Sequence, residues 1–142
     1  MSQKRGTYKD TDAMRRDMMK VYNEVYSTCW TQKEAWEKTI RHPAPRYYIS
    51  PKQAYEVLRP MCFYNDFTAV EKMKPTRQRL YTSLYETVMK MAQKREYLGM
   101  SLHHIVNHAV SQEAPEFFVE WEAMRKIFRI EKAKFAKRRN NT

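Results

Sequence analysis

Three histidines close together in the chain are the side chains best suited to chemistry. His104 and His108 lie one helical turn apart, a spacing at which two imidazoles can bind the same metal ion, and His103 is adjacent. The residues between them are Ile-Val-Asn, so the glutamate of a metalloprotease helix is missing, and neither Cys29 nor Cys62 is near in sequence. We therefore favour a surface or partly buried histidine group, and predict no metal and no cofactor.

The rest of the sequence offers no recognisable catalytic motif. Only two glycines occur, so a glycine-rich phosphate loop cannot be built, and no paired carboxylates or nucleophile with its base are evident. We therefore predict that the protein is not an enzyme. The two cysteines lie among apolar neighbours, as reduced core residues do. Without a long apolar run or a signal-like start, we expect no membrane partner and an intracellular protein, cytoplasmic, nucleoid-associated or carried in a virion.

Positive charge is gathered at the two ends of the chain. The formal net charge is +11, of which residues 1–9 hold +3 and residues 131–142 hold +4. Basic ends of this kind suit nucleic acid, because each cation that neutralises a phosphate releases counterions. The candidate contacts at the ends are Lys4, Arg5, Lys9, Lys134, Lys137, Arg138 and Arg139. The alternative is that these ends are solvated and only keep the protein soluble.

One segment of the sequence recurs 70 residues later. Ala-Pro-Arg-Tyr-Tyr-Ile at 44–49 returns as Ala-Pro-Glu-Phe-Phe-Val at 114–119, and Thr31 and Ser101 are matched helix caps. Further upstream the offset is 63, aligning residues 21–25 with 84–88. The seven-residue difference is about two helical turns and keeps the apolar stripe in phase. We interpret the chain as two copies of one three-helix unit, the alternative being chance similarity of aromatic and aliphatic residues.

The elements that would position these residues are all helical. We predict an all-α fold in which two tandem units, at residues 11–60 and 76–130, pack into one small bundle across a connector at 61–75. Basic arms at 1–10 and 131–142 flank them. Thr31, Ser50 and Ser101 are predicted N-caps, Pro60 is expected to end the third helix, and Gly99 to end a long helix from Thr76.

The order of capped helices resembles helix-turn-helix DNA-binding proteins, in which the last helix of the unit enters the major groove. The segment at 42–49 is longer than the usual turn of that family, so its docking geometry does not transfer directly. The Pro-Ala-Pro-Arg run at 43–46, followed by two aromatics, also resembles a motif of short uncharacterised proteins from gut Bacteroidetes and their phages. That second resemblance implies no function.

Copy one is the more basic of the two over matched stretches. Residues 42–59 carry +2 and residues 112–129 carry −1. On copy one, Lys52, Gln53 and Tyr55 are the candidate contacts to base edges, and Arg46 and Arg59 the candidate contacts to phosphates.

The aromatic pairs at 47–48 and 117–118 could stack on unpaired bases, but their recurrence in both copies favours core packing. We thus expect a non-catalytic nucleic-acid-binding protein, regulatory or architectural, with DNA favoured over RNA. The alternative is a structural or interaction protein of a phage particle or other large assembly, with protein subunits as partners.

Overall fold

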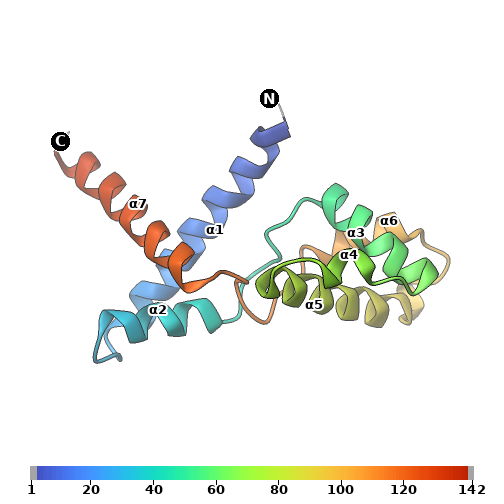
Figure 1. The fold of residues 1–142 in the computed structure, drawn as a ribbon. Helices are drawn as coiled ribbons and strands as arrows, with labels where there is room; N and C mark the ends of the chain where they lie inside the picture. Colours follow the sequence, from blue (N-terminus) through green and yellow to red (C-terminus); the bar gives the residue numbers. More distant parts are fainter. Residues whose placement is uncertain (1–2, 141–142) are drawn as a thin grey trace.

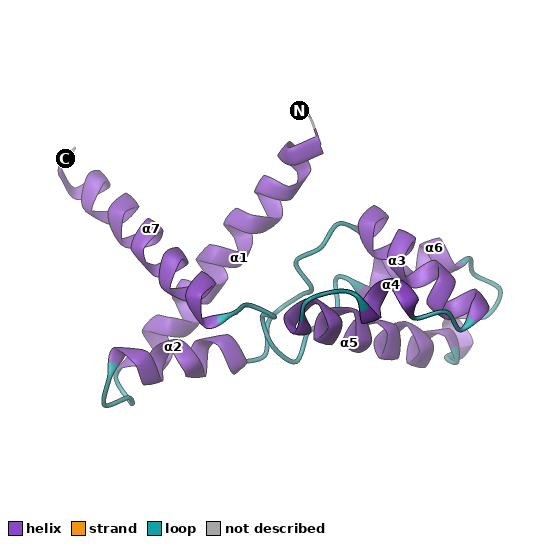
Figure 2. Cartoon of the chain, viewed as in Figure 1, coloured by secondary structure: helices purple, strands orange, loops and turns teal. Residues whose placement is uncertain are grey.

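The computed structural model describes the backbone of residues 3–140 and the side chains of residues 11–134. Within these residues the fold is all-α, as predicted, and the segments between helices are loops and turns (Figure 2). The α-helices are α1 (Gln3–Tyr26), α2 (Gln32–Arg41), α3 (Pro51–Tyr64), α4 (Thr68–Glu71), α5 (Pro75–Ala92), α6 (Leu102–Ala109) and α7 (Trp121–Asn140). A short 3-10 helix at Arg95–Tyr97 precedes α6.

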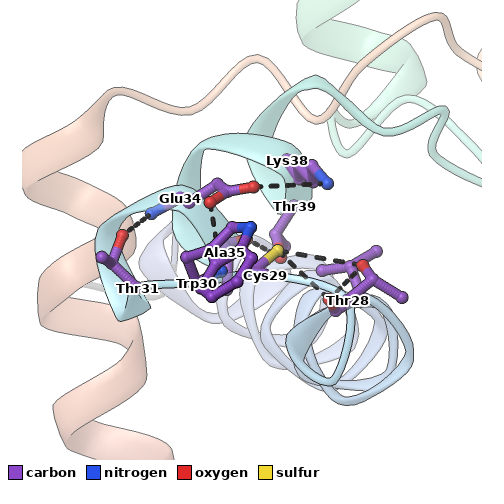
Figure 3. Close-up of polar contacts among 9 residues, drawn as sticks. Thr28, Cys29, Trp30, Thr31, Glu34, Ala35, Lys38 and Thr39 are labelled. Atoms are coloured by element: carbon purple, nitrogen blue, oxygen red, sulfur yellow. Dashed lines mark hydrogen bonds and ion pairs between the residues drawn. The ribbon is translucent and has the colours of Figure 1, made fainter.

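The helix starts follow local chemistry. The hydroxyls of Thr31, Ser50 and Ser101 each accept the backbone N–H three residues ahead, at 3.1 Å, so the three predicted N-caps are confirmed. Figure 3 shows the first of these caps, at the start of α2. There the Glu34 carboxylate accepts the N–H of Trp30 at 3.2 Å, one residue before the cap. The α2 end of the α1–α2 turn is thereby fixed by the side chains of Thr31 and Glu34.

Several helix ends differ from those expected. The predicted arm at 1–10 is, from Gln3 onward, the first turns of α1, and α7 continues to Asn140 through the predicted tail. Pro60 does not end α3: the buried Leu58 and Met61 hold the helix on either side of it, and the helix stops at Asn65 in the left-handed conformation. Gly99, with φ +80°, serves the turn before α6, because α5 already ends at Ala92.

The helices pack in two groups. Helices α1, α2 and α7 contact one another, and we call them the terminal lobe; α3, α5 and α6 do the same, with α4 against α5, and form the central lobe. In Figure 1 the two lobes lie on either side of the loops that join them. Helices α1 and α7 diverge from their crossing point, and the two chain ends lie at their tips.

This packing differs from the consecutive units that the repeat suggests. The third helix of copy one, α3, packs on α5 and α6, while α7 occupies the matching place on α1 and α2. Each lobe therefore joins two helices of one copy to the third helix of the other. The cause lies in the proline-containing segments 42–50 and 110–120. These segments follow α2 and α6 in an extended conformation and carry the chain across the molecule. Consecutive α2 and α3 thus do not form the compact helix-turn-helix expected from chain order.

The two crossing segments, 42–50 and 110–120, meet at a pair of buried alanines. Ala44 and Ala114 exchange both backbone hydrogen bonds, at 2.9 and 2.8 Å. Two further backbone bonds flank them, from the Tyr47 N–H to the Val110 carbonyl (2.9 Å) and from the Phe117 N–H to the Ile40 carbonyl (3.3 Å). A shift of 70 residues maps the residues of each flanking bond onto those of the other. The sequence repeat is therefore expressed as an approximate two-fold axis at the alanine pair.

Candidate nucleic-acid interface

The lobes divide the positive charge unequally. Helix α7 carries eight Lys or Arg against two Glu, and the terminal lobe as a whole, residues 1–41 and 121–142, has a net charge of +9. The central lobe, residues 51–109, has +4, and the two crossing segments together have −2. Exchange of the third helices thus brings the most basic helix of the chain into contact with α1 and α2. The terminal lobe is the part of the molecule suited to a polyanion.

Helix α7 separates its apolar and basic residues by face. Met124, Ile127 and Phe128 are buried, at 0 to 8% exposure, against the other helices of the terminal lobe. Arg125, Arg129 and Lys132 are exposed, and their spacing of four and then three residues sets them in one row on a different face. Lys126 is exposed as well, whereas the exposed Lys134 forms an ion pair with the half-buried Glu131 at 3.3 Å.

Helix α1 adds a second row. Arg16 and Lys20 are exposed one turn apart, while Met18 and Val21 face the core. Arg5 and Lys9 stand eleven and seven residues before Arg16, about three and two turns, so they belong to the same row of the helix. Their side chains lie outside the described residues, as do those of Lys4, Lys137, Arg138 and Arg139.

The contact residues predicted on copy one are found in the other lobe. Lys52, Gln53 and Arg59 are exposed on α3, and the half-buried Tyr55 packs its ring 4.9 Å from that of His103. Exposure is what such contacts require. However, α3 belongs to the central lobe, so these residues do not share one lobe with the basic ends of α1 and α7.

Arg46 has a local role in the crossing segment. It is half-buried, its Nε donates to the Tyr47 carbonyl at 3.2 Å, and its guanidinium lies 5.8 Å from the Tyr48 ring. Its repeat counterpart, Glu116, instead accepts two hydrogen bonds from Arg79 of α5, at 3.1 and 3.2 Å. These bonds raise the pKa of Arg79 above its usual value. Glu116 therefore ties its crossing segment to α5, whereas Arg46 packs along its own segment.

The paired aromatics pack in the interior. Tyr47 and Phe117 are 1% and 3% exposed, and each stacks on the second aromatic of the other copy, Phe118 and Tyr48, with ring centroids 6.0 Å apart. The core interpretation is confirmed. The aromatics that solvent does reach were missed by sequence reasoning: Trp30 in the α1–α2 turn is 95% exposed.

The histidines form no recognisable metal centre. The rings of His104 and His108 lie 4.5 Å apart, and the Tyr97 hydroxyl is 3.4 Å from Nδ1 of His108. Within the part of the chain that the structure describes, no group of three or more potential ligand residues is placed to hold a metal ion. In the same part of the chain, none of the helices is both long and apolar enough to traverse a bilayer.

Comparison with models of known protein families, with curated proteins and with solved structures finds no match for this chain. Its function is therefore argued from the charge, exposure and packing of its own residues.

Proposed function

We propose that this is a non-catalytic nucleic-acid-binding protein, regulatory or architectural, that binds duplex DNA through its terminal lobe. The observation that carries the proposal is the concentration of charge: +9 of the net +11 belongs to α1, α2 and α7. The exposed row Arg125, Arg129 and Lys132 offers cations at helical spacing to successive phosphates. Neutralising phosphates in this way supplies most of the affinity of sequence-tolerant DNA binding.

The shape of the terminal lobe supports the same ligand. Helices α1 and α7 contact each other, with the rings of Tyr22 and Phe128 4.9 Å apart. The two helices diverge toward the chain ends (Figure 1). Beyond Phe128, α7 continues to Asn140, a stretch of about 18 Å at 1.5 Å per residue. The major groove is about 12 Å wide, so this stretch can cross it. Basic helices that fork from a common root are a known way of holding a duplex.

The repeat supplies a matched test of this assignment. Arg129 and Arg59 are exposed at equivalent positions, 70 residues apart, on α7 and α3. We expect Arg129→Ala to weaken binding of a labelled duplex about eightfold at about 0.1 M salt and to lower the salt slope by about 0.9. Arg59→Ala should change the affinity less than about twofold. Fluorescence anisotropy over a series of salt concentrations measures both quantities.

Two outcomes would contradict the proposal. Equal losses in the Arg129→Ala and Arg59→Ala variants would remove the assignment to the terminal lobe. Absence of duplex binding even at about 50 mM salt would remove the function itself, because electrostatic binding is strongest there. A labelled RNA duplex of the same sequence, titrated in parallel, tests the preference for DNA.

A second candidate function is that of an interaction protein in a larger assembly. The observation that favours it is the exposure of large aromatics: Trp30 is 95% exposed, Tyr26 56%, Phe63 57% and Tyr64 68%. Aromatic side chains dominate the energetics of protein interfaces. An interface of this kind should persist when salt is raised, whereas DNA binding should fall steeply, so the same salt series separates the two functions.

A further inference from the structure

The terminal lobe holds an open cleft of about 470 Å³ that is lined by residues of α1, α2 and α7. Among the lining residues, Tyr22 and Phe128 are buried, whereas Tyr26 is 56% exposed and its ring centroid lies 5.5 Å from that of Tyr22. Pockets of roughly 300 to 1,000 Å³ with mainly apolar walls accommodate small organic molecules. The cleft therefore has room for a planar ring beside an exposed aromatic side chain.

The polar groups of the cleft are suited to a neutral ring that carries its own donors and acceptors. Asn23 and Gln32 are exposed, and each side-chain amide offers both a donor and an acceptor. Glu131 also lines the cleft, and its ion pair with Lys134 engages one of its two carboxylate oxygens. A carboxylate disfavours a phosphate at this place. Amides and carboxylates are, however, the side chains that hydrogen-bond the edges of nucleobases.

The exposed rows of α1 and α7 both reach this cleft. Each row has three exposed residues at intervals of four and then three: Arg16, Lys20 and Asn23 on α1, and Arg125, Arg129 and Lys132 on α7. Residues at these intervals share one face of a helix. Asn23 and Lys132, the last residue of each row, line the cleft. A strand whose phosphates lie along either row therefore has a nucleotide next to the cleft.

We propose that this cleft binds one unpaired base of a DNA strand, a base with an exocyclic amino group such as adenine. The inference rests on the proposed function, because phosphate contacts along the two rows bring the strand to the cleft. The base stacks on the ring of Tyr26, and the amide of Asn23 or Gln32 contacts its edge. The Glu131 carboxylate accepts from its amino group. Bases outside a duplex are commonly held in this way, by aromatic stacking together with hydrogen bonds to their edges.

The test compares three labelled duplexes of one sequence: fully paired, with one bulged adenine, and with an abasic residue in place of that adenine. The abasic duplex keeps the interrupted backbone of the bulge but has no base to stack. We expect the full-length protein to bind the adenine bulge about fivefold or more tightly than the abasic duplex, because stacking on one aromatic side chain contributes at least this much. Fluorescence anisotropy at about 0.1 M salt measures all three affinities.

Two exposed tyrosines supply the variant and its control. Tyr26→Ala should reduce the ratio of the adenine-bulge affinity to the abasic affinity below about twofold, whereas Tyr26→Phe, which keeps the ring, should preserve it. Tyr26 is 56% exposed, so both variants keep the fold. Tyr64 is 68% exposed on α3 of the central lobe, and Tyr64→Ala should leave the ratio unchanged.

The three duplexes also separate this inference from the function on which it rests. Equal affinity for the adenine and abasic bulges, or the same ratio in wild type and Tyr26→Ala, overturns the inference, while binding of the paired duplex still supports the proposed function. Free adenosine monophosphate that binds as tightly as the adenine bulge also overturns it, because the strand would then contribute nothing. Failure of the wild type to bind any of the three duplexes contradicts the proposed function and the inference together.

Discussion

The Tyr47 hydroxyl links the two copies of the repeat and can be removed without changing the shape of the ring. The phenol oxygen lies 2.6 Å from the Ser83 hydroxyl and 3.2 Å from that of Thr87, both on α5. Thr87 also donates to the Ser83 carbonyl at 3.0 Å, so it keeps a partner when the phenol is lost. Ser83 does not. Phe is the natural residue at the matched position 117, so Tyr47→Phe introduces a ring that this scaffold already accepts.

The size of the effect follows from burial. Tyr47 is 1% exposed, so water cannot replace the lost hydrogen bond at the ring. Removing one partner of such a bond costs about 1 to 2 kcal/mol, and in a chain of this length each kcal/mol lowers Tm by roughly 3 to 4 °C. We therefore expect Tyr47→Phe to lower the free energy of unfolding by that amount and Tm by roughly 3 to 8 °C.

Thermal and urea unfolding of four proteins measures the contact itself: wild type, Tyr47→Phe, Ser83→Ala and the double variant. We expect a coupling of about 1 kcal/mol between the two sites, because each single variant already breaks the shared bond. Additive effects, or a loss below about 0.3 kcal/mol in Tyr47→Phe, would show that this hydroxyl does not tie copy one to α5. The packing of the crossing segments would then have to be explained by their backbone bonds and ring stacking alone.

Three further predictions concern other contacts. Tyr48→Phe removes the bond of 2.5 Å to the Asp17 carboxylate and should cost about 1.5 to 3 kcal/mol in thermal unfolding; an unchanged Tm would contradict the contact. Burial raises the pKa of Tyr48 and of Tyr81, so both should ionise after the exposed tyrosines in an absorbance titration. Their contribution to stability is complete below about pH 10 and is lost as pH rises through the folded-state pKa values; unchanged stability in that range would refute it. Gly99→Ala should cost about 1 kcal/mol through backbone strain alone, because no atom lies within 4 Å of the added Cβ, and Gly99→Asn should cost less.

Local features of the fold were predictable because they depend on neighbours in sequence. A capping hydroxyl reaches an amide three residues away, so Thr31, Ser50 and Ser101 identify helix starts without any knowledge of the tertiary structure. The repeat was visible because several matched core positions are buried in both copies. Ala44 and Ala114, for example, are 0% and 1% exposed.

The exchange of third helices could not be predicted in this way. Helix α3 presents Ala54 and Leu58 to the core, and α7 presents Met124 and Phe128 at the same register. Either apolar stripe can pack on the first two helices of either copy. The hydrophobic pattern therefore does not predict which pair α3 or α7 covers. The path of the crossing segments decides the matter, and that path depends on contacts between residues 70 positions apart.

The interface predicted from the sequence differs from the one proposed on the terminal lobe because of the stretch over which charge was counted. The net charge of residues 42–59 was compared with that of residues 112–129. The second stretch includes three glutamates of the crossing segment, Glu113, Glu116 and Glu120, and leaves out the basic C-terminal half of α7. Charge counted over each helix gives α7 a net +6 and α3 a net +1. The signal was therefore present in the sequence, but only helix boundaries and lobe membership show which charges act together.

The two lobes have similar interiors and different surfaces. At the position where α3 has the half-buried Cys62, whose thiol pKa is raised by burial, α7 has the exposed Lys132. In the central lobe, α4 packs on α5 beside the half-buried Tyr85, whereas the matching Tyr22 of the terminal lobe is buried against Phe128 of α7. Outside the core, the terminal lobe is thus the more basic of the two, with a net charge of +9 against +4.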